Sequence, residues 1–410
     1  MGRAVTGFHR DGCGLGIITA SFSSTAGTGE RRMLLVSEPS LGIDERDALA
    51  AVIDSGWVTM GDRVEEFEKS FAQMHGVDDS IAVCSCTAAL HLILHALGIG
   101  PGDEVLVPSL TFVATANSVL YVGARPVFVD IGSTAAPLMS LDEAEAKCTS
   151  RTKAVILVHF SGYLAHRDAW QSFARRKGLM LIEDAAHSPG LPDVGTYGEA
   201  AAFSFYGNKN MTTAEGGAII ANSSALRASI RQARAHGMTS GTRQRLTARR
   251  PDYDVTVLGF NYRMDELRAA LGLAQLKKLP EWNEARRRLS LIYRELLSIQ
   301  CPSVLVPFEP AWLSTHHLMP VVLPATVSRQ AIINRLRKRG IQTTIHYPPV
   351  HRLTFYHELY PDTSLPRTED FCRRELTLPL HPKMVRSDVE RVTHCLAAAL
   401  DAELPVGAVA

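Results

Sequence analysis

The sequence has almost no excess of charge of either sign and no long apolar run. Its 410 residues include 43 Lys or Arg and 42 Asp or Glu, so the formal net charge is +1. This balance gives no electrostatic reason to expect nucleic acid or a membrane surface as a partner. No apolar run reaches the length that a membrane span needs. With 46% hydrophobic residues, the composition is that of a globular protein with a sizeable core.

Cysteine is sparse and irregularly spaced. The odd number and the scatter argue against a disulfide framework, so we expect a reducing compartment, the cytoplasm. Cys84 and Cys86 are two residues apart, but no second ligand pair follows at metal spacing. We therefore interpret both as small buried residues and expect no metal site. The cysteines are Cys13, Cys84, Cys86, Cys148, Cys301, Cys372 and Cys395.

Residues 1–32 lack the patterning of the remaining chain. The stretch 21–32 is rich in Ser, Thr and Gly and ends in charged residues. The apolar patch 15–20 is too short for a secretory signal. The first well-patterned segment starts at Met33. We therefore expect either a disordered extension or translation that begins at Met33 in the cell.

Short apolar runs with strand character alternate with helical segments between residues 80 and 220. Strands joined in this way need crossover connections. We therefore predict an α/β fold with a large, mostly parallel sheet covered by helices on both faces. The predicted strands are 80–83, 104–107, 124–130, 154–159, 179–183, 201–206 and 218–220.

The pattern changes after residue 283. The spacing predicts a helix over 265–279 that stops at Pro280, and a second helix over 284–297 that links two domains. Strands at 319–323 and 341–346 and helices at 328–339, 369–375 and 387–403 complete a smaller α+β region. We predict an extension (1–32), a large domain (33–283), and a linking helix with a small C-terminal domain (284–410).

An acid and a lysine stand at the ends of two strand-like runs within 181–217. Asp184 ends the first run, and Lys209 follows the second. Burying both groups is costly unless they have a task. The two groups together can serve an aldehyde cofactor, because a lysine amine forms an imine and a carboxylate pairs with a protonated pyridine nitrogen. This arrangement is what pyridoxal phosphate needs.

Further polar or aromatic residues lie at or near predicted strand ends, where ligands gather in parallel sheets. The small residues of 85–89 join a strand to a helix start, which suits an anion because free N–H groups and the helix dipole point at it. A plain N-cap remains the alternative for this motif. The strand-end residues are Thr87, Phe112, His159, Asp184 and Ser204.

A long loop, 236–254, holds four arginines. Loops of this length in compact domains are usually functional or mobile. Clustered arginines suit a diphosphate, and a solvated basic loop is the equal alternative. The arginines are Arg243, Arg245, Arg249 and Arg250.

These motifs resemble those of the DegT/DnrJ/EryC1/StrS sugar aminotransferases, a branch of the fold-type-I pyridoxal-phosphate enzymes. The resemblance implies a seven-stranded-type sheet domain, a small C-terminal domain, pyridoxal 5'-phosphate as cofactor, and a homodimer with shared active sites. It covers nearly everything from residue 33 to about 400. The stretches that carry it are SEPSLG (37–42), SGWVTMG (55–61), SCTAALHL (85–92), GIGPGDEVLVPSLTFVATANSVLYVGARPVFVDI (98–131), IEDAAHSPG (182–190), AAFSFYGNKNMTTAEGGAI (201–219), HGMT (236–239), LGFNYRMDELRAALGLAQLKKL (258–279), IHYPPVH (345–351) and LPLHPKM (378–384).

The family pattern implies roles for the residues around the cofactor ring. Lys209 resembles the Schiff-base lysine, which also moves the proton in catalysis. Asp184 resembles the partner of the pyridine nitrogen, and His187 occupies the position near the phenolic oxygen. Phe112 sits where an aromatic side chain stacks on the ring.

The same pattern implies a phosphate site and a substrate entrance. Thr87, the backbone of Ala88 and Ser204 fall at phosphate-binding positions. Asn261 matches an asparagine that reaches the phosphate from the neighbouring subunit. Trp57 and Thr59 resemble residues at the substrate entrance. His346 and Tyr347, with His351, lie where relatives close over the site, and a satisfied turn histidine is the alternative for that segment.

The chain departs from the family pattern at two places. Cys86 replaces the usual glycine of the phosphate turn, which changes how closely the backbone approaches the phosphate. The segment 159–166 departs from the commoner His-Leu-Tyr-Gly pattern, which affects substrate contacts. Family dehydratases carry a histidine in place of the Schiff-base lysine, so Lys209 favours transamination.

The resulting hypothesis is a transaminase that moves an amino group from glutamate or glutamine to a keto-sugar, linked to a nucleotide, in amino sugar biosynthesis for polysaccharides or antibiotics. One alternative is an aminocyclitol (keto-inositol) aminotransferase, because it shares the cofactor motifs. The other is a non-catalytic regulator that retains the fold, which would have no need of both Lys209 and Asp184.

Overall fold

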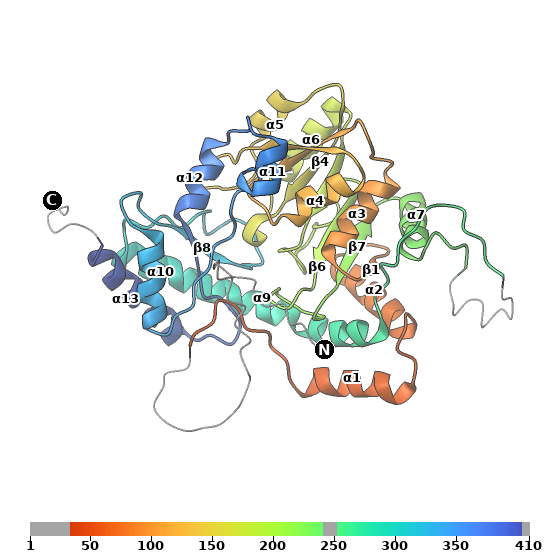
Figure 1. The fold of residues 1–410 in the computed structure, drawn as a ribbon. Coiled ribbons are helices and arrows are strands. Elements are labelled where there is room, and N and C mark those ends of the chain that lie inside the picture. Colours follow the sequence, from red (N-terminus) through yellow and green to blue (C-terminus); the bar gives the residue numbers. More distant parts are fainter. Residues whose placement is uncertain (1–32, 241–251, 404–410) are drawn as a thin grey trace, which may run out of the picture. The chain divides into compact units, whose positions relative to one another are not determined.

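A computed structural model describes residues 33–240 and 252–403 (Figure 1). The predicted extension 1–32 and the four arginines of 243–250 lie outside these ranges. Within them, no helix is long and apolar enough to cross a membrane. The six cysteines of the described part are all unpaired. The same part holds no group of three or more His, Cys, Asp or Glu arranged to bind a metal ion.

A seven-stranded sheet forms the centre of the large region, with strand order β1-β7-β6-β5-β4-β2-β3. Only β7 runs antiparallel to its neighbours, which confirms the prediction of a mostly parallel sheet. Side chains alternate between its two faces, as strand geometry requires. The strands are β1 (Ile81–Val83), β2 (Glu104–Pro108), β3 (Arg125–Val129), β4 (Thr152–Val158), β5 (Met180–Asp184), β6 (Ala200–Ser204) and β7 (Gly217–Ala221).

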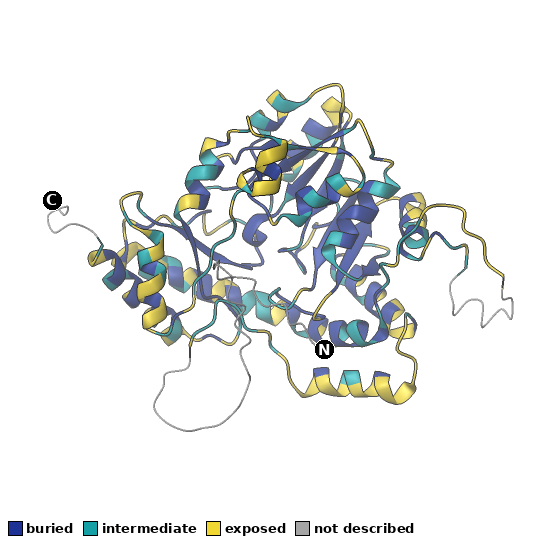
Figure 2. Ribbon diagram, in the orientation of Figure 1, coloured by how far each residue is buried: buried dark blue, intermediate teal, exposed yellow. Residues whose placement is uncertain are grey.

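Helices cover both faces of this sheet (Figures 1 and 2). One face packs against α3 (Cys86–Ala96), α4 (Ala114–Tyr121) and α7 (Ser224–Arg234). The other packs against α5 (Leu141–Lys147) and α6 (Arg167–Lys177) over β2 to β5, and against α2 (Asp62–Met74) and α9 (Glu266–Gln300) over β6 and β7. Helix α1 (Ile43–Ser55) contacts α9. In Figure 2 the strands are dark blue, the colour of buried residues, and the helices around them are partly exposed. The sheet is therefore the centre of the core.

The predicted helix end at Pro280 is wrong. Helix α9 is 35 residues long and continues through Pro280 to Gln300. Proline removes one backbone hydrogen bond and crowds the preceding turn. The helix persists because both sides of the proline are buried in apolar clusters: Leu276 and Leu279 belong to the cluster under the sheet, and Leu289 and Tyr293 belong to the C-terminal cluster.

The C-terminal region has a core of its own, built on a two-stranded antiparallel sheet of β8 (Met319–Val322) and β9 (Glu375–Leu378). Helices α10 (Arg329–Lys338) and α13 (Arg386–Asp401) pack in this core, whereas α11 (Thr354–Leu359) and α12 (Pro366–Arg374) pack against the large region through Tyr356 and Phe371. The predicted strand over 341–346 is wrong, because Ile341 and Thr344 form only isolated bridges, with Leu34 and Thr377 respectively. The division at residue 283 stays a prediction.

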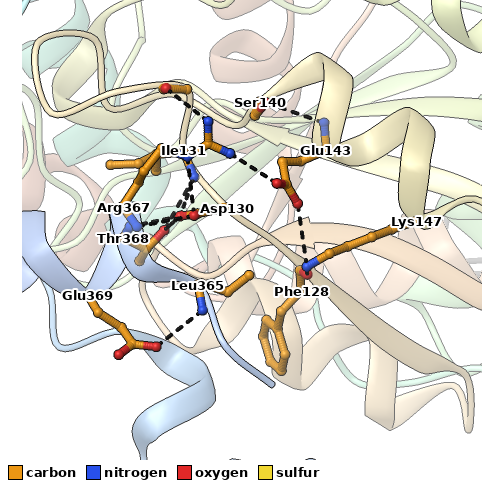
Figure 3. Close-up of polar contacts among 11 residues, drawn as sticks. Phe128, Asp130, Ile131, Ser140, Glu143, Lys147, Leu365, Arg367, Thr368 and Glu369 are labelled. Atoms are coloured by element: carbon orange, nitrogen blue, oxygen red, sulfur yellow. Dashed lines mark hydrogen bonds and ion pairs between the residues drawn. The ribbon is translucent and has the colours of Figure 1, made fainter. Parts of the chain in front are cut away.

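A buried carboxylate holds α12 against the end of β3 (Figure 3). Oδ1 of Asp130 accepts hydrogen bonds of 2.7 Å from both the backbone N–H and the hydroxyl of Thr368, at the start of α12. Arg367 donates to the other oxygen of Asp130 and to Glu143 on α5. A carboxylate at a helix start satisfies free N–H groups and suits the helix dipole. This contact fixes α12, which leads directly into β9.

Candidate active site

A cavity of about 410 Å³ opens at the carboxyl end of the large sheet. This is the edge at which parallel sheets bind ligands, and the volume suits a small molecule. The chain brings to this cavity most of the residues that the sequence singled out. They are Thr87, Phe112, Asp184, His187, Ser204, Lys209, His346 and Tyr347.

Asp184 ends strand β5 and is 6% exposed. Its Oδ2 accepts a hydrogen bond of 2.7 Å from the hydroxyl of Thr115 on α4, and its Oδ1 accepts one from the N–H of Ala186. Burial raises the pKa of Asp184, while the bond from Thr115 and the charge of Lys209 act in the opposite direction. A buried carboxylate that retains such donors is poised to pair with a cation in the cavity.

Lys209 lies in the turn between β6 and β7 and lines the same cavity as Asp184. Its backbone N–H donates to the carbonyl of Tyr206, and the next turn is closed by Thr213 N–H donating to Phe205. Burial lowers the pKa of Lys209 to about 8, although Cys86 and Asp184 favour the charged form. A lysine with a pKa near neutrality has an appreciable fraction of free amine, which is the nucleophilic form.

The start of α3 forms a cradle at one end of the cavity. The Ser85 hydroxyl caps the helix by accepting from Ala88 N–H, while Cys86 and Thr87 occupy the first turn, where N–H groups lack an intrahelical acceptor. Strand β7 approaches very closely, because a Cβ on Gly217 would lie only 2.7 Å from the nitrogen of Cys86. Cys86 itself lines the cavity, so the thiol occupies space that the usual glycine would leave open.

His187 and Tyr347 form a fixed polar pair on another wall of the cavity. Nδ1 of His187 accepts from the N–H of Ser161, so the neutral ring carries its proton on Nε2. Burial lowers the pKa of His187 well below its usual value, which keeps the ring neutral. Nε2 then donates to the Tyr347 hydroxyl, 3.1 Å away. The hydroxyl hydrogen of Tyr347 is left for a ligand in the cavity.

Four predicted site residues are not among those that line the cavity. Ala88 uses its N–H to bond Ser85. Asn261 is exposed and forms an isolated bridge with Ala235. Trp57 and Thr59 are exposed in the segment between α1 and α2. The roles that the family pattern implies for these residues stay predictions.

His159, at the end of a predicted strand, is not among the residues that line the cavity and has a structural role instead. His159 is completely buried, and it bonds Glu183 through Nε2 at 3.0 Å and accepts from Ala165 N–H through Nδ1. Glu183 also accepts from the N–H groups of Gly195 and Tyr197. The pair therefore fixes the loop after β5 and leaves the cavity to Asp184.

Sequence reasoning missed several residues of the site. Thr115 is buried on α4 and orients Asp184. Tyr206 and Asn208, which both shortly precede Lys209 in the sequence, line the cavity as well. Helix α4 also carries Asn117 and Ser118, so the sequence did not single out Thr115, and only its hydrogen bond to Asp184 in the folded chain reveals it.

Comparison with known proteins agrees with this geometry. The model of the DegT/DnrJ/EryC1/StrS aminotransferase family matches residues 39–397. The chain belongs to this family. It is a pyridoxal-phosphate-dependent transaminase.

Three solved structures illustrate the similarity. The aminotransferase TlmJ from Streptoalloteichus hindustanus is 34% identical, with a TM-score of 0.84 over 90% of this chain and 99% of that one. DesI, solved in the presence of its TDP-sugar product, is 32% identical, with a TM-score of 0.81 over 91% and 95%. NtdA from Bacillus subtilis, with its cofactor PMP bound, is 31% identical, with a TM-score of 0.80 over 87% and 81%.

The cavity of this family member fits its cofactor. Pyridoxal phosphate supplies an aldehyde carbon and a ring that accepts electrons. The cavity offers a nucleophilic amine in Lys209, a carboxylate in Asp184, and a helix start at Cys86 and Thr87 that suits a phosphate group. Gly217 is the residue that lets β7 approach this cradle, because a side chain there would collide with Cys86.

Proposed function

We propose that this transaminase moves an amino group from glutamate or glutamine to the ketone of a nucleotide-linked sugar. The observation that carries the proposal is a single cavity lined by both Lys209 and Asp184, together with a similarity to DesI, which was solved with a TDP-sugar product. The cavity is also lined by a half-exposed aromatic side chain, Tyr206. Aromatic faces of this kind suit the flat and apolar surfaces of a sugar or a nucleobase.

Lys209 and Asp184 are the proposed catalytic residues. Lys209 would hold the cofactor between turnovers, and its amine, once free, would move the proton that transamination requires. Asp184 keeps the proton on the ring nitrogen of the cofactor. His187 would lie near the phenolic oxygen of the bound cofactor, and Phe112 would cover one face of its ring. These assignments agree with the residues that line the cavity.

The phosphate of the cofactor is proposed to lie at the start of α3. Thr87 would bind it there, with Ser204 at the end of β6, and the backbone N–H of Ala88 would join them by exchanging its bond to the Ser85 hydroxyl. Thr87 and Ser204 both line the cavity. Trp57 and Thr59 are proposed at the substrate entrance, and His346 and Tyr347 as substrate contacts.

The proposed assembly is a homodimer with shared active sites. Support comes from large apolar side chains that are exposed around α1 and before Asn261. Such a concentration of exposed apolar side chains suits a protein interface. Asn261 lies outside its own cavity and is assigned to the phosphate of the partner subunit. The exposed side chains are Leu41, Ile43, Ile53, Trp57, Val58, Tyr253, Val255, Val257 and Leu258.

The substrate class is tested by a screen with the purified holoenzyme. Keto-sugars linked to nucleotides, free keto-sugars and keto-inositols are each incubated with glutamate or glutamine, and the amine formed is measured by mass spectrometry. Amination of a nucleotide-linked keto-sugar with the highest kcat/KM supports the proposal. Preference for a keto-inositol would replace it with the aminocyclitol alternative. The mass of the particle in solution tests the homodimer.

A further inference from the structure

Strand β9 presents two different faces. Leu376 and Leu378 pack into the apolar cluster of the C-terminal region, and Leu376 lies opposite Val321 of β8. Glu375 and Thr377 point to the other face, as the period of two requires. Both of these polar residues are completely buried. Burying a carboxylate on a short strand costs free energy unless it is bonded, so its partners are informative.

Those partners connect Glu375 to the active-site cavity. Oε1 of Glu375 lies 2.6 Å from the hydroxyl oxygen of Thr377, and the same hydroxyl oxygen lies 2.8 Å from Nδ1 of His346. The backbone N–H of His346 donates to Oε2 of Glu375 at 2.9 Å, which holds the carboxyl group in place. The three side chains therefore form a continuous chain of hydrogen bonds.

The far end of this chain is the active site. His346 lines the cavity together with Lys209. Because Nδ1 of His346 is hydrogen-bonded to Thr377, only Nε2 of His346 is left to interact with groups in the cavity. Burial and then the charge of Lys209 lower the pKa of His346 to about 3, so the free ring is neutral and carries a single proton.

We propose that Glu375, Thr377 and His346 form a proton relay between the active-site cavity and a buried carboxylate. With Glu375 ionised, Thr377 donates to Glu375, His346 donates from Nδ1 to Thr377, and Nε2 is an acceptor. A proton that leaves the Lys209 ammonium binds Nε2 of His346. The proton on Nδ1 then passes to Thr377, and the hydroxyl proton of Thr377 passes to Glu375.

The products of this step balance its reactants. Lys209 becomes a neutral amine and Glu375 becomes a neutral acid. His346 ends as the other neutral tautomer, with its proton on Nε2, and Thr377 again carries one proton. His346 is thus the group that faces the reacting atoms, while Thr377 and Glu375 are positioning residues that set its tautomer.

The surroundings of Glu375 favour a carboxyl group that exchanges its proton near neutral pH. Burial raises its pKa to about 8, although Thr377, the His346 N–H and the charge of Arg329 act in the opposite direction. Arg329 on α10 does not pair with the carboxylate. Its guanidinium donates to the backbone carbonyls of Cys372 and Glu375 instead. Within residues 33–240 and 252–403, Glu375 makes no ion pair.

Apart from the charged guanidinium of Arg329, the titratable side chains near Glu375 are neutral at the same pH. Burial raises the pKa of both the Cys372 thiol and the Tyr347 phenol, and the charge of Glu375 contributes to each rise. Burial lowers the pKa of the free Lys209 amine to about 8 and raises the pKa of Glu375 to about 8. Both values lie near the pH range in which general acid–base catalysis by a side chain is most effective.

The inference rests on the proposed role of Lys209 as proton carrier, but its test needs no turnover. Holoenzyme labelled with ¹⁵N at histidine, in which Lys209 holds the cofactor, is titrated between about pH 6 and about pH 10, which brackets the pKa of about 8 of Glu375. The signals of His346 are assigned by their loss in His346→Asn. In the wild type we expect Nε2–H at low pH and Nδ1–H at high pH, with a midpoint near 8.

Three variants test the connection itself. In Glu375→Gln the amide donates to Thr377 at every pH, so His346 is expected to keep Nε2–H throughout. Thr377→Ser keeps the hydroxyl and is expected to retain the wild-type transition, whereas Thr377→Val is expected to abolish it. A His346 tautomer that stays constant with pH in the wild type, or that is unaffected by Glu375→Gln, would overturn the relay.

Kinetics provide a second readout. Thr377→Val is expected to lower kcat about tenfold with little change in KM, and Thr377→Ser to restore it, since positioned proton transfer contributes a factor of this order or more. Equal kcat values in the two variants would contradict a role in turnover. If instead no substrate is found, the tautomer series still decides whether the relay exists.

Discussion

The hydroxyl of Thr115 donates a hydrogen bond of 2.7 Å to Oδ2 of Asp184. Thr115 in turn receives one of 2.7 Å from Thr111, because its single proton is committed to Asp184. A side chain of helix α4 thereby holds the carboxylate at the end of β5 in place. The bond opposes the effect of burial on the pKa of Asp184 and fixes the direction in which the carboxylate faces the cavity.

Removing this hydroxyl should weaken catalysis without unfolding the chain. In Thr115→Val the pKa of Asp184 is expected to rise further, which leaves more of the carboxyl group neutral. A hydrogen bond to a charged group contributes about 1.5 to 3 kcal/mol, so kcat is expected to fall roughly tenfold or more. Thr115→Ser is the control and should stay near the wild-type rate. Equal rates for Val and Ser would contradict the role of the hydroxyl.

Replacing Lys209 should remove both cofactor attachment and turnover. Lys209→Ala lacks the only amine that the cavity offers among the described residues, so we expect the visible absorbance of the holoenzyme to disappear and activity to fall below detection. Lys277→Ala, a change on the exposed side of α9, is the control and should keep both. Residual transaminase activity in Lys209→Ala would overturn the assignment.

Neutralising Asp184 should separate binding from chemistry. Asp184→Asn keeps the shape of the side chain and the acceptor for Thr115, but it removes the charge that holds a proton on the ring nitrogen of the cofactor. We expect the cofactor to remain bound while kcat falls by about 10² or more, in line with the loss of a preorganised charge. Spectrophotometric titration with the cofactor measures its binding, and steady-state rates measure kcat. A near-normal kcat would remove Asp184 from the mechanism.

Glu375 should make stability depend on pH in a defined window. Burial raises its pKa from 4.5 to about 8, so between these values the folded chain holds a proton that the unfolded chain has released. Its contribution is therefore fully present below about 4.5 and is lost as the pH rises through about 8. The free energy of unfolding of Glu375→Gln, minus that of the wild type, should increase across this window and then level off.

Glu369→Gln provides the opposite sign for comparison. The pKa of Glu369 is lowered despite burial, because His351 and Arg352 bond its carboxylate. The contribution of Glu369 to the free energy of unfolding is fully present at neutral pH. It is lost only as the pH falls below 4.5, the ordinary pKa of glutamate, and through the lowered pKa of Glu369. Urea unfolding at a series of pH values measures both variants. A flat difference for Glu375→Gln would show that its carboxyl group titrates normally.

Ala214 should be a site of backbone strain. It has φ of 66° in the turn between β6 and β7, a region that favours glycine. Ala214→Gly is expected to stabilise the fold by up to about 1 kcal/mol, because the left-handed strain outweighs the greater freedom of glycine in the unfolded chain. Ala228→Gly, on the exposed side of α7, should instead destabilise it by about 1 kcal/mol. Thermal unfolding distinguishes the two directions.

The sequence by itself determined the sheet and the two central catalytic candidates. Each strand of the large region is a short apolar run, and periodicities of 2.0 and 3.6 are local properties that can be read without coordinates. Asp184 and Lys209 follow such runs, so the carboxyl edge of the sheet brings them to one cavity. The same reasoning failed at Pro280, because packing on both sides of the proline outweighs its local preference.

Only the tertiary structure decided which polar groups touch. Thr115 lies 69 residues before Asp184, and the Ser161 N–H that sets the tautomer of His187 lies 26 residues away. Glu375 and His346 meet across a gap of 29 residues. No local pattern encodes such pairs, since they depend on how helices and strands pack in space. The sequence thus determined the elements and the chemistry available, and packing determined the protonation state of each group.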